Sequence, residues 1–199
     1  MADDLPELTV ADATAWRHWL AAHHDDPAGV WLVLAKKGTT QPTTLSYVQA
    51  LDEALCHGWI DGQVRRRDEG TFRQRFTPRR SRSAWSQRNV AHVQRLRDEG
   101  RMHASGERAV SAAQADGRWE SAYAGQRTMQ VPDDLQAALA AQPRAQQMFA
   151  LLTSQNRYSV LLRIDSAKRR DTRERRIEQF VAMLARGETV HPQKRRLPD

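Results

Sequence analysis

The first third of the chain alternates between amphipathic and fully apolar stretches, which predicts helices and strands in turn. After Asp12, apolar residues recur at helical spacing, so we expect a helix over 13–24 that this aspartate caps. The short apolar run at 30–36 is rich in strand-forming residues and predicts a buried strand. A second helix is expected to start at a Ser46 cap and to end near His57.

Two strands joined by a tight turn are predicted next. The first begins at Trp59 and continues to about Arg67. An Asp-Glu-Gly turn follows, and the sequence then alternates strictly over 71–77. Because side chains alternate across a strand, Phe72 and Phe76 share one face. We expect a hairpin.

From Pro78 onward the periodicity becomes helical. Helices or short apolar helical segments are expected from Ser83 or Ser86 to Gly100, over 103–115, from Pro132, near 148–152 and over 158–186. The last of these has an interrupted apolar face. Asp171 followed by Glu174 resembles a capping box, so we expect a break there.

These elements predict an α+β fold with a small antiparallel sheet of about three strands packed by helices, followed by a mainly helical C-terminal half. We expect an α+β part over 1–85 and a helical part over 86–187 that packs on it as one unit. The remaining residues, 188–199, are expected to form a mobile basic tail.

Composition narrows the class of protein. The chain has 199 residues and is 40% hydrophobic, as expected of a globular protein. We find no signal peptide and no apolar run long enough to cross a membrane, so we expect no membrane insertion. Cys56 is the single cysteine, which excludes an internal disulfide and fits a reducing cytoplasm.

The net charge of +7 is unevenly distributed. Residues 1–64 carry a net charge of −6, whereas residues 65–88 carry +7 and include nine arginines. The net charge is +1 over 89–162 and +5 over 163–199. Such clustering favours binding of phosphates, carboxylates or an acidic partner.

Unusual residues are densest between Cys56 and Asn89. Arginine suits a planar anion because its guanidinium donates two parallel hydrogen bonds to carboxylate or phosphate. A helix start at Ser83–Ser86 would add free backbone N–H groups beside these arginines. The predicted ligand-binding residues of this segment are Trp59, Asp61, Arg79, Arg80, Ser83, Trp85 and Asn89.

The residues of this segment also allow a purely structural interpretation. A solvated hairpin face accounts for Arg65, Arg66, Arg67, Arg73 and Arg82. For Arg79 and Arg80 two alternatives remain: either they bind a ligand, or they form structural ion pairs. The two tryptophans could be core residues, and Asp61 could simply form a turn.

Candidate catalytic and metal-binding residues are few, and we assign no catalytic residue. His57 is expected at a helix C-terminus, where the helix dipole favours a cationic ring. Cys56 is expected to be buried and inert. Adjacent residues diverge by about 100° on a helix, so His23-His24-Asp25-Asp26 is not expected to hold a metal. Phosphate-loop, dinucleotide, zinc-protease and Ser-hydrolase motifs are absent, and we expect no cofactor.

An ordered series of short segments resembles the YdeI/OmpD-associated family, also described as bacteriocin-protection proteins. The matching pieces are Leu55–Gly62, Phe76–Arg80 with Ser83, Trp85, Ser86 and Asn89, Gly100–Met102, Gly117–Trp119 with Ala122 and Tyr123, Pro132–Leu135, and Ile164 with Ala167, Lys168, Thr172, Arg173, Arg176 and Ile177. The resemblance implies a small bacterial cytosolic protein with an α+β front part and a helical rear. Its motifs carry over onto Trp59, Asp61, Arg79, Ser83, Trp85, Asn89, Lys168 and Arg173. His57 departs from the family pattern.

Three functions follow as hypotheses. The first is a stress- or antimicrobial-resistance-associated binding protein whose arginine site takes an anionic small molecule or an acidic partner. The second is non-specific nucleic-acid binding through the hairpin and the basic C-terminal segment. The third is an enzyme of unknown reaction that uses His57, Asp61 or Lys168 as acid or base. The sequence does not indicate an oligomeric state.

Overall fold

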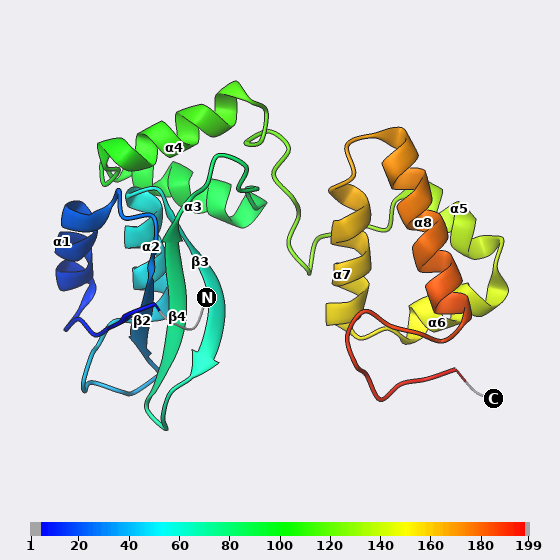
Figure 1. Cartoon of the computed structure of the whole chain (residues 1–199), viewed down its shortest axis with the longest axis horizontal. Helices are drawn as coiled ribbons and strands as arrows, with labels where there is room; N and C mark the ends of the chain where they lie inside the picture. Colours follow the sequence, from blue (N-terminus) through cyan, green and yellow to red (C-terminus); the bar gives the residue numbers. More distant parts are fainter. Residues whose placement is uncertain (1–4, 198–199) are drawn as a thin grey trace. The chain divides into compact units, whose positions relative to one another are not determined.

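The computed structural model describes residues 5–197, and the chain divides into two units, Met1–Ala122 and Tyr123–Asp199. The sheet and the helices before residue 122 belong to the first unit, and the helices after it form the second (Figure 1). We expected an α+β part over 1–85 with a helical part over 86–187 packed on it. In the structure the two helices after the hairpin belong to the first unit, because they pack on helix α2 (Tyr47–Cys56).

The sheet has four strands in the order β1-β2-β4-β3. Strands β2 (Val30–Ala35), β4 (Thr71–Pro78) and β3 (Trp59–Arg66) pair antiparallel, which confirms the three predicted strands and the hairpin. The additional strand β1 (Glu7–Leu8) pairs parallel to β2. A strand of two residues has no periodicity, so the sequence pattern did not predict it.

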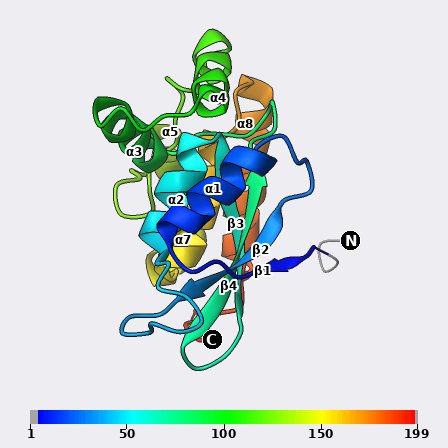
Figure 2. The same ribbon diagram turned by 90° about the vertical axis from the view of Figure 1, so that its left-hand side faces the viewer.

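Helices α1 (Ala13–His23) and α2 (Tyr47–Cys56) lie against one face of this sheet (Figure 2). Both predicted caps are confirmed: Asp12 accepts from the Ala15 N–H, and Ser46 forms a capping box with Gln49. The core that they share with the sheet contains Trp16, Leu20, Val30, Leu32, Leu34, Leu45, Ala50, Ala54, Trp59 and Phe76.

Helices α3 (Gln87–Asp98) and α4 (Ala104–Ala115) complete the first unit. Ser86, one of the two serines considered, caps α3 by accepting from the Asn89 N–H. The two helices enclose a second core around the outer side of α2, formed by Leu51, Leu55, Cys56, Trp85, Val93, Leu96, Val110 and Ala113.

The start of α4 touches the end of α2. The His103 N–H donates to the Cys56 carbonyl at 3.0 Å, and Ser105 Oγ donates to the His57 carbonyl at 3.0 Å. Gly106 allows this approach, since a Cβ built there would lie 2.1 Å from the Cys56 oxygen. Gly58 turns the chain away from α2 with a φ of +79°, which favours glycine.

A buried carboxylate ties α2 to two other segments. Glu53 is 2% exposed and accepts from Arg17 Nε and Nη2 at 2.8 and 2.7 Å. It also accepts from Arg101 Nη2 at 2.7 Å. Burial alone would raise the pKa of Glu53, but the bonds from the two guanidinium groups outweigh it and hold that pKa below its usual value.

The second unit consists of α5 (Asp133–Ala140), α6 (Pro143–Leu151), α7 (Ser154–Asp165) and α8 (Arg170–Ala185). The predicted break in the last helical stretch is confirmed, but α8 begins at Arg170 with Arg169 at the cap position, so the predicted cap at Asp171 is wrong. The core of this unit contains Leu135, Leu139, Ala145, Met148, Phe149, Leu152, Val160, Leu161, Ile164, Ile177 and Leu184.

The segment after Gly187 differs from the mobile tail that we expected. Between Thr189 and Arg195 it makes hydrogen bonds to Asn156, Ser159 and Leu151. Its last two residues lie outside the described part of the chain. Among residues 5–197, no helix has the length and apolar character needed to cross a membrane.

We predict that Glu53→Gln destabilises the first unit by about 2 kcal/mol at pH 7, because two arginines lose their shared counter-charge while Arg17 stays partly solvated. The pKa of Glu53 is lowered in the folded protein, so its stabilisation is present above its usual pKa of 4.5 and declines as pH falls further. The difference between variant and wild type should therefore be smaller at pH 4 than at pH 7.

All six tryptophans lie in this unit, so urea unfolding followed by tryptophan fluorescence measures the stability of this unit selectively. Glu120→Gln, at an exposed position, should leave stability nearly unchanged at both pH values. An equal effect of Glu53→Gln at both would contradict the assignment.

Gly106→Ala tests the contact between α2 and α4. Alanine should gain about 1 kcal/mol in helix propensity. The clash with the Cys56 carbonyl should cost more, for a net loss of about 2 kcal/mol. Gly62→Ala is the matched control, because a Cβ there would meet Arg75 at an ordinary 3.7 Å. If the urea midpoint shifts no more for Gly106→Ala than for the control, the contact is looser than described.

Candidate anion-binding site

A pocket of about 440 Å³ opens in the first unit where four segments meet. These are the end of α1, the turn between α2 and β3, the end of β4, and the first turns of α4. The lining residues are His24, Asp25, Pro27, His57, Gly58, Pro78, Arg79, Arg80, Ser105, Arg108 and Ala109.

Backbone contacts fix the walls of this pocket. The Arg79 N–H donates to the Gly58 carbonyl at 2.9 Å, which joins the end of β4 to the α2–β3 turn. The bond from Ser105 to the His57 carbonyl joins the same turn to α4. The chain segments that carry the lining side chains are therefore held by one backbone hydrogen bond and by the hydroxyl of Ser105, which itself lines the pocket.

Two neighbouring arginines come from the end of β4. The guanidinium carbon of Arg79 lies 3.5 Å from the ring centroid of Trp85, and Nη1 donates to the Ala84 carbonyl at 3.2 Å. Arg80 sits in a tight turn, where its N–H donates to Ser83 Oγ at 3.0 Å and its carbonyl accepts from the Ser83 N–H at 2.9 Å. The turn fixes the Arg80 backbone, and stacking on Trp85 fixes the Arg79 side chain.

Positive charge predominates in the lining. Arg108 comes from the second turn of α4 and adds a third guanidinium to those of Arg79 and Arg80. The one carboxylate that lines the pocket is Asp25, whose side chain is 85% exposed and lies 3.3 Å from His24 Nε2. The start of α4 adds the positive end of a helix dipole. The pocket therefore favours an anion.

His57 lines the pocket at the end of α2. Its side chain is almost fully buried, and Nδ1 lies 2.9 Å from the Glu53 carbonyl. A carbonyl can only accept, so Nδ1 carries the hydrogen and Nε2 is the basic nitrogen. Burial lowers the pKa of His57, and the nearby His103 and His24 lower it further. Burial thus opposes the cationic form that the helix dipole was expected to favour.

Three imidazole rings gather beside the pocket. The His103 ring stacks on His57 with centroids 4.9 Å apart and meets His24 edge-on at 5.2 Å. His103 also caps α4 by accepting from the Ser105 N–H. Within residues 5–197, no group of histidine, cysteine and acidic side chains has the geometry to hold a metal ion.

The two predicted tryptophans lie in the two cores of the first unit. Trp59 is fully buried, and its Nε1 donates to the His24 carbonyl at 3.0 Å. Trp85 is 1% exposed and meets Trp119 edge-on at 4.8 Å. Trp59 therefore supports the α1 end that lines the pocket, and Trp85 supports Arg79.

Three further predicted residues make local structural contacts. Asp61 accepts from the Tyr47 hydroxyl at 2.9 Å, which ties β3 to α2. Burial, together with the neighbouring Asp61 carboxylate, raises the pKa of Tyr47 to about 12. Ser83 closes the turn at Arg80, and Asn89 lies in the first turn of α3. None of the three lines the pocket, because the helix start found there is that of α4.

Lys168 and Arg173 belong to the second unit. Arg173 forms a two-pronged ion pair with Asp134, at 2.5 and 2.9 Å, and donates to the Ile164 carbonyl at 3.1 Å. The pairing lowers the pKa of Asp134. Arg173 thereby joins α8 to α5 and α7, whereas Lys168 is exposed between α7 and α8.

The residues considered for acid–base chemistry do not converge. His57 lines the pocket, Asp61 bonds to Tyr47 outside it, and Lys168 is part of the other unit. Burial raises the pKa of the Cys56 thiol to about 12, which fits the expected inert cysteine.

Sequence reasoning located Arg79 and Arg80 but missed Arg108 and Ser105. These residues lie on a helix whose own sequence is unremarkable in pattern. Their place beside His57 depends on a contact between positions 48 residues apart. Only the unusual glycine at position 106, inside a predicted helix, hinted at a close approach of another segment.

Comparisons with known proteins divide the chain in a similar way to its structure. Residues 8–109, just over half of the chain, match the model of a domain of unknown function (DUF8412). Residues 128–187 match the model described as bacteriocin-protection, YdeI or OmpD-associated. No curated protein and no solved structure matches the chain. The chain thus belongs to the DUF8412 family through its first unit, and the match over its second unit supports the resemblance to the bacteriocin-protection, YdeI or OmpD-associated family.

Proposed function

We propose that the protein is a binding protein whose first unit takes a small anionic ligand, recognised by a phosphate or carboxylate group, in the pocket beside Arg80 and Arg108. The observation that carries the proposal is that three arginines and the start of a helix line one hollow. Guanidinium groups bind both kinds of anion through paired hydrogen bonds, and the positive end of the α4 dipole adds to the attraction.

The size of the pocket supports a ligand larger than a single ion. A volume of 440 Å³ lies within the range of about 300–1,000 Å³ that is usual for small-molecule sites. The side chains of Arg80 and Arg108 are exposed, and no carboxylate among residues 5–197 forms an ion pair with either. Both guanidinium groups are therefore available to an incoming anion.

The family description supports a wider role as a further proposal. We propose that anion binding serves stress or antimicrobial resistance, because the matched family is described by bacteriocin protection. We also propose a cytoplasmic location. The buried, unpaired cysteine is in keeping with a reducing compartment.

Titration with inorganic phosphate, pyrophosphate and citrate tests the binding site. Bound anion should change the fluorescence of Trp85 through Arg79, which lies on its ring. Arg80→Gln and Arg108→Gln should each weaken binding on the order of 10-fold, the usual effect of losing a charged hydrogen bond. Arg82→Gln is the matched control, since it removes the same charge from the same loop but does not line the pocket. Equal weakening by all three variants, or no response to any anion, would overturn the proposal.

A second candidate function is binding of single-stranded nucleic acid on the sheet face opposite α1 and α2. Arg65 and Arg73 lie side by side on paired strands, and Arg75 lies opposite Trp31. The Arg65 guanidinium sits 4.6 Å from the Trp31 ring centroid, while Arg73 pairs with Glu7. Because Trp31 is 2% exposed, this face offers charge but little aromatic surface for base stacking.

This candidate predicts strongly salt-dependent binding. Fluorescence polarisation with a labelled oligonucleotide of about 12 nucleotides should show binding at about 50 mM salt that falls steeply by about 200 mM. The pair Arg65→Gln with Arg75→Gln should weaken it more than Arg82→Gln with Arg88→Gln, which removes equal charge elsewhere. An unchanged polarisation at the lower salt concentration would exclude this function.

A further inference from the structure

A buried asparagine fastens the segment that follows α8. Asn156 lies on α7 and is 1% exposed. Its Oδ1 accepts from the His191 N–H at 2.8 Å, and its Nδ2 donates to the His191 carbonyl at 3.0 Å. His191 is also held through its ring, whose Nε2 lies 2.9 Å from Ser159 Oγ. The chain after the last helix thus has a fixed course along α7.

Gln193 extends this attachment. Its Oε1 accepts from Asn156 Nδ2 at 2.9 Å and from the Thr153 N–H at 3.1 Å. Its Nε2 donates to the Leu151 carbonyl at 3.3 Å and to the Arg195 carbonyl at 2.8 Å. The amide of Gln193 therefore connects the end of α6 and the start of α7 to the backbone that carries Arg195 and Arg196.

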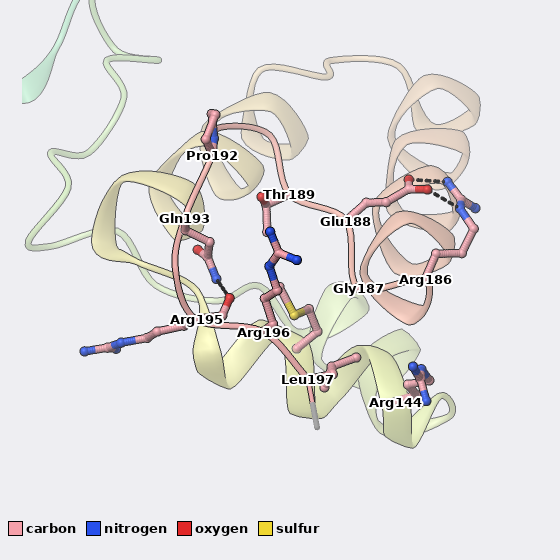
Figure 3. A pocket seen from close by; sticks show the side chains of 11 residues that line it. Arg144, Arg186, Gly187, Glu188, Thr189, Pro192, Gln193, Arg195, Arg196 and Leu197 are labelled. Atoms are coloured by element: carbon pink, nitrogen blue, oxygen red, sulfur yellow. Dashed lines mark hydrogen bonds and ion pairs between the residues drawn. The ribbon is translucent and has the colours of Figure 1, made fainter. Parts of the chain in front are cut away.

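A cavity of about 510 Å³ lies between this segment and the ends of α6 and α8 (Figure 3). Arg196 extends across it toward Thr189, whereas Arg195 points away from its centre (Figure 3). The lining residues are Arg144, Met148, Arg186, Gly187, Glu188, Thr189, Pro192, Gln193, Arg195, Arg196 and Leu197.

Cationic groups outnumber acids in this lining. Four arginines come from three places: α6, the end of α8 and the C-terminal segment. Glu188 is the one carboxylate, and it is fully engaged by Arg186 in a pair of bonds at 2.9 and 2.8 Å. Arg144 donates from Nε to the Ala185 carbonyl at 3.0 Å, which offsets the negative end of the α8 dipole. Within residues 5–197, no acidic group pairs with Arg195 or Arg196.

We propose that this cavity is a second binding site, for a small molecule carrying two or more phosphate or carboxylate groups. Arg196 and Arg144 contact the charged groups, and Asn156 and Gln193 are positioning residues that hold the Arg195–Arg196 backbone at the rim. The cavity has the size of a metabolite site, and its cations are separated from one another. A ligand with several anionic groups therefore fits it better than a ligand with one.

The site is independent of the pocket in the first unit, because all of its lining residues belong to the second. The two can also be observed separately. Every tryptophan lies before residue 123, so ligand bound in the second unit should leave tryptophan fluorescence nearly unchanged while it releases or absorbs heat. Failure of one proposal is therefore distinguishable from failure of the other.

Isothermal titration calorimetry of the full chain tests the site, with tripolyphosphate and citrate as probes. The Arg80→Gln and Arg108→Gln substitutions are made together as a background that weakens the first pocket. In this background one of the probes should still bind, and adding Arg196→Gln should weaken that binding on the order of 10-fold. Preference for tripolyphosphate or for citrate shows which anionic group the site takes.

Arg175→Gln is the matched control, because Arg175 is exposed on α8 and does not line the cavity. It should change the affinity less than about 2-fold, as expected for a distant, solvent-screened charge. Gln193→Ala should weaken binding without removing a charge. Equal weakening by Arg196→Gln and Arg175→Gln would show diffuse attraction to a basic surface and would overturn the proposal. Absence of heat with either probe in the double-variant background would overturn it as well.

Discussion

The close contact between the end of α2 and the start of α4 is the constraint on which the first unit depends. It requires a glycine at position 106, because any side chain there would meet the Cys56 carbonyl. The contact places Ser105 and Arg108 beside His57, and the α2–β3 turn in turn holds the end of β4 through Gly58. The segments that carry Arg79, Arg80 and Arg108 are therefore brought together by this contact and by the hydrogen bonds beside it.

The arginines of this chain fall into two groups according to their partners. Arg17, Arg101 and Arg173 neutralise carboxylates and connect helices, so their charge is used within the fold. Arg80, Arg108 and Arg196 line cavities, with no acidic partner among residues 5–197. The net charge of +7 is thus an excess of cations over internal partners, part of which lies where a ligand could use it.

Local structure could be predicted from the sequence because its determinants are local. Asp12, Ser46 and Ser86 cap helices where expected, and the strict alternation at 71–77 marks a strand. Long-range contacts could not be predicted in this way. Helix periodicity does not indicate which other element a helix packs against. The sequence pattern therefore did not show that α3 and α4 pack on α2. The basic tail looked unstructured because its attachment depends on Asn156, one polar residue on a distant helix.

The motifs behind the family resemblance are explained mainly by structure. Trp59 and Trp85 are core residues, Asp61 and Ser83 make local hydrogen bonds, and Arg173 is an ion-pair partner. Such residues specify a fold and do not indicate a reaction. Of these five, only Arg173 lies within residues 128–187, the stretch that matches the bacteriocin-protection, YdeI or OmpD-associated model. Residues at the two cavities, such as Arg108 and Arg196, fall outside those motifs. A substitution at either cavity rim would therefore leave the cores and the helix caps intact.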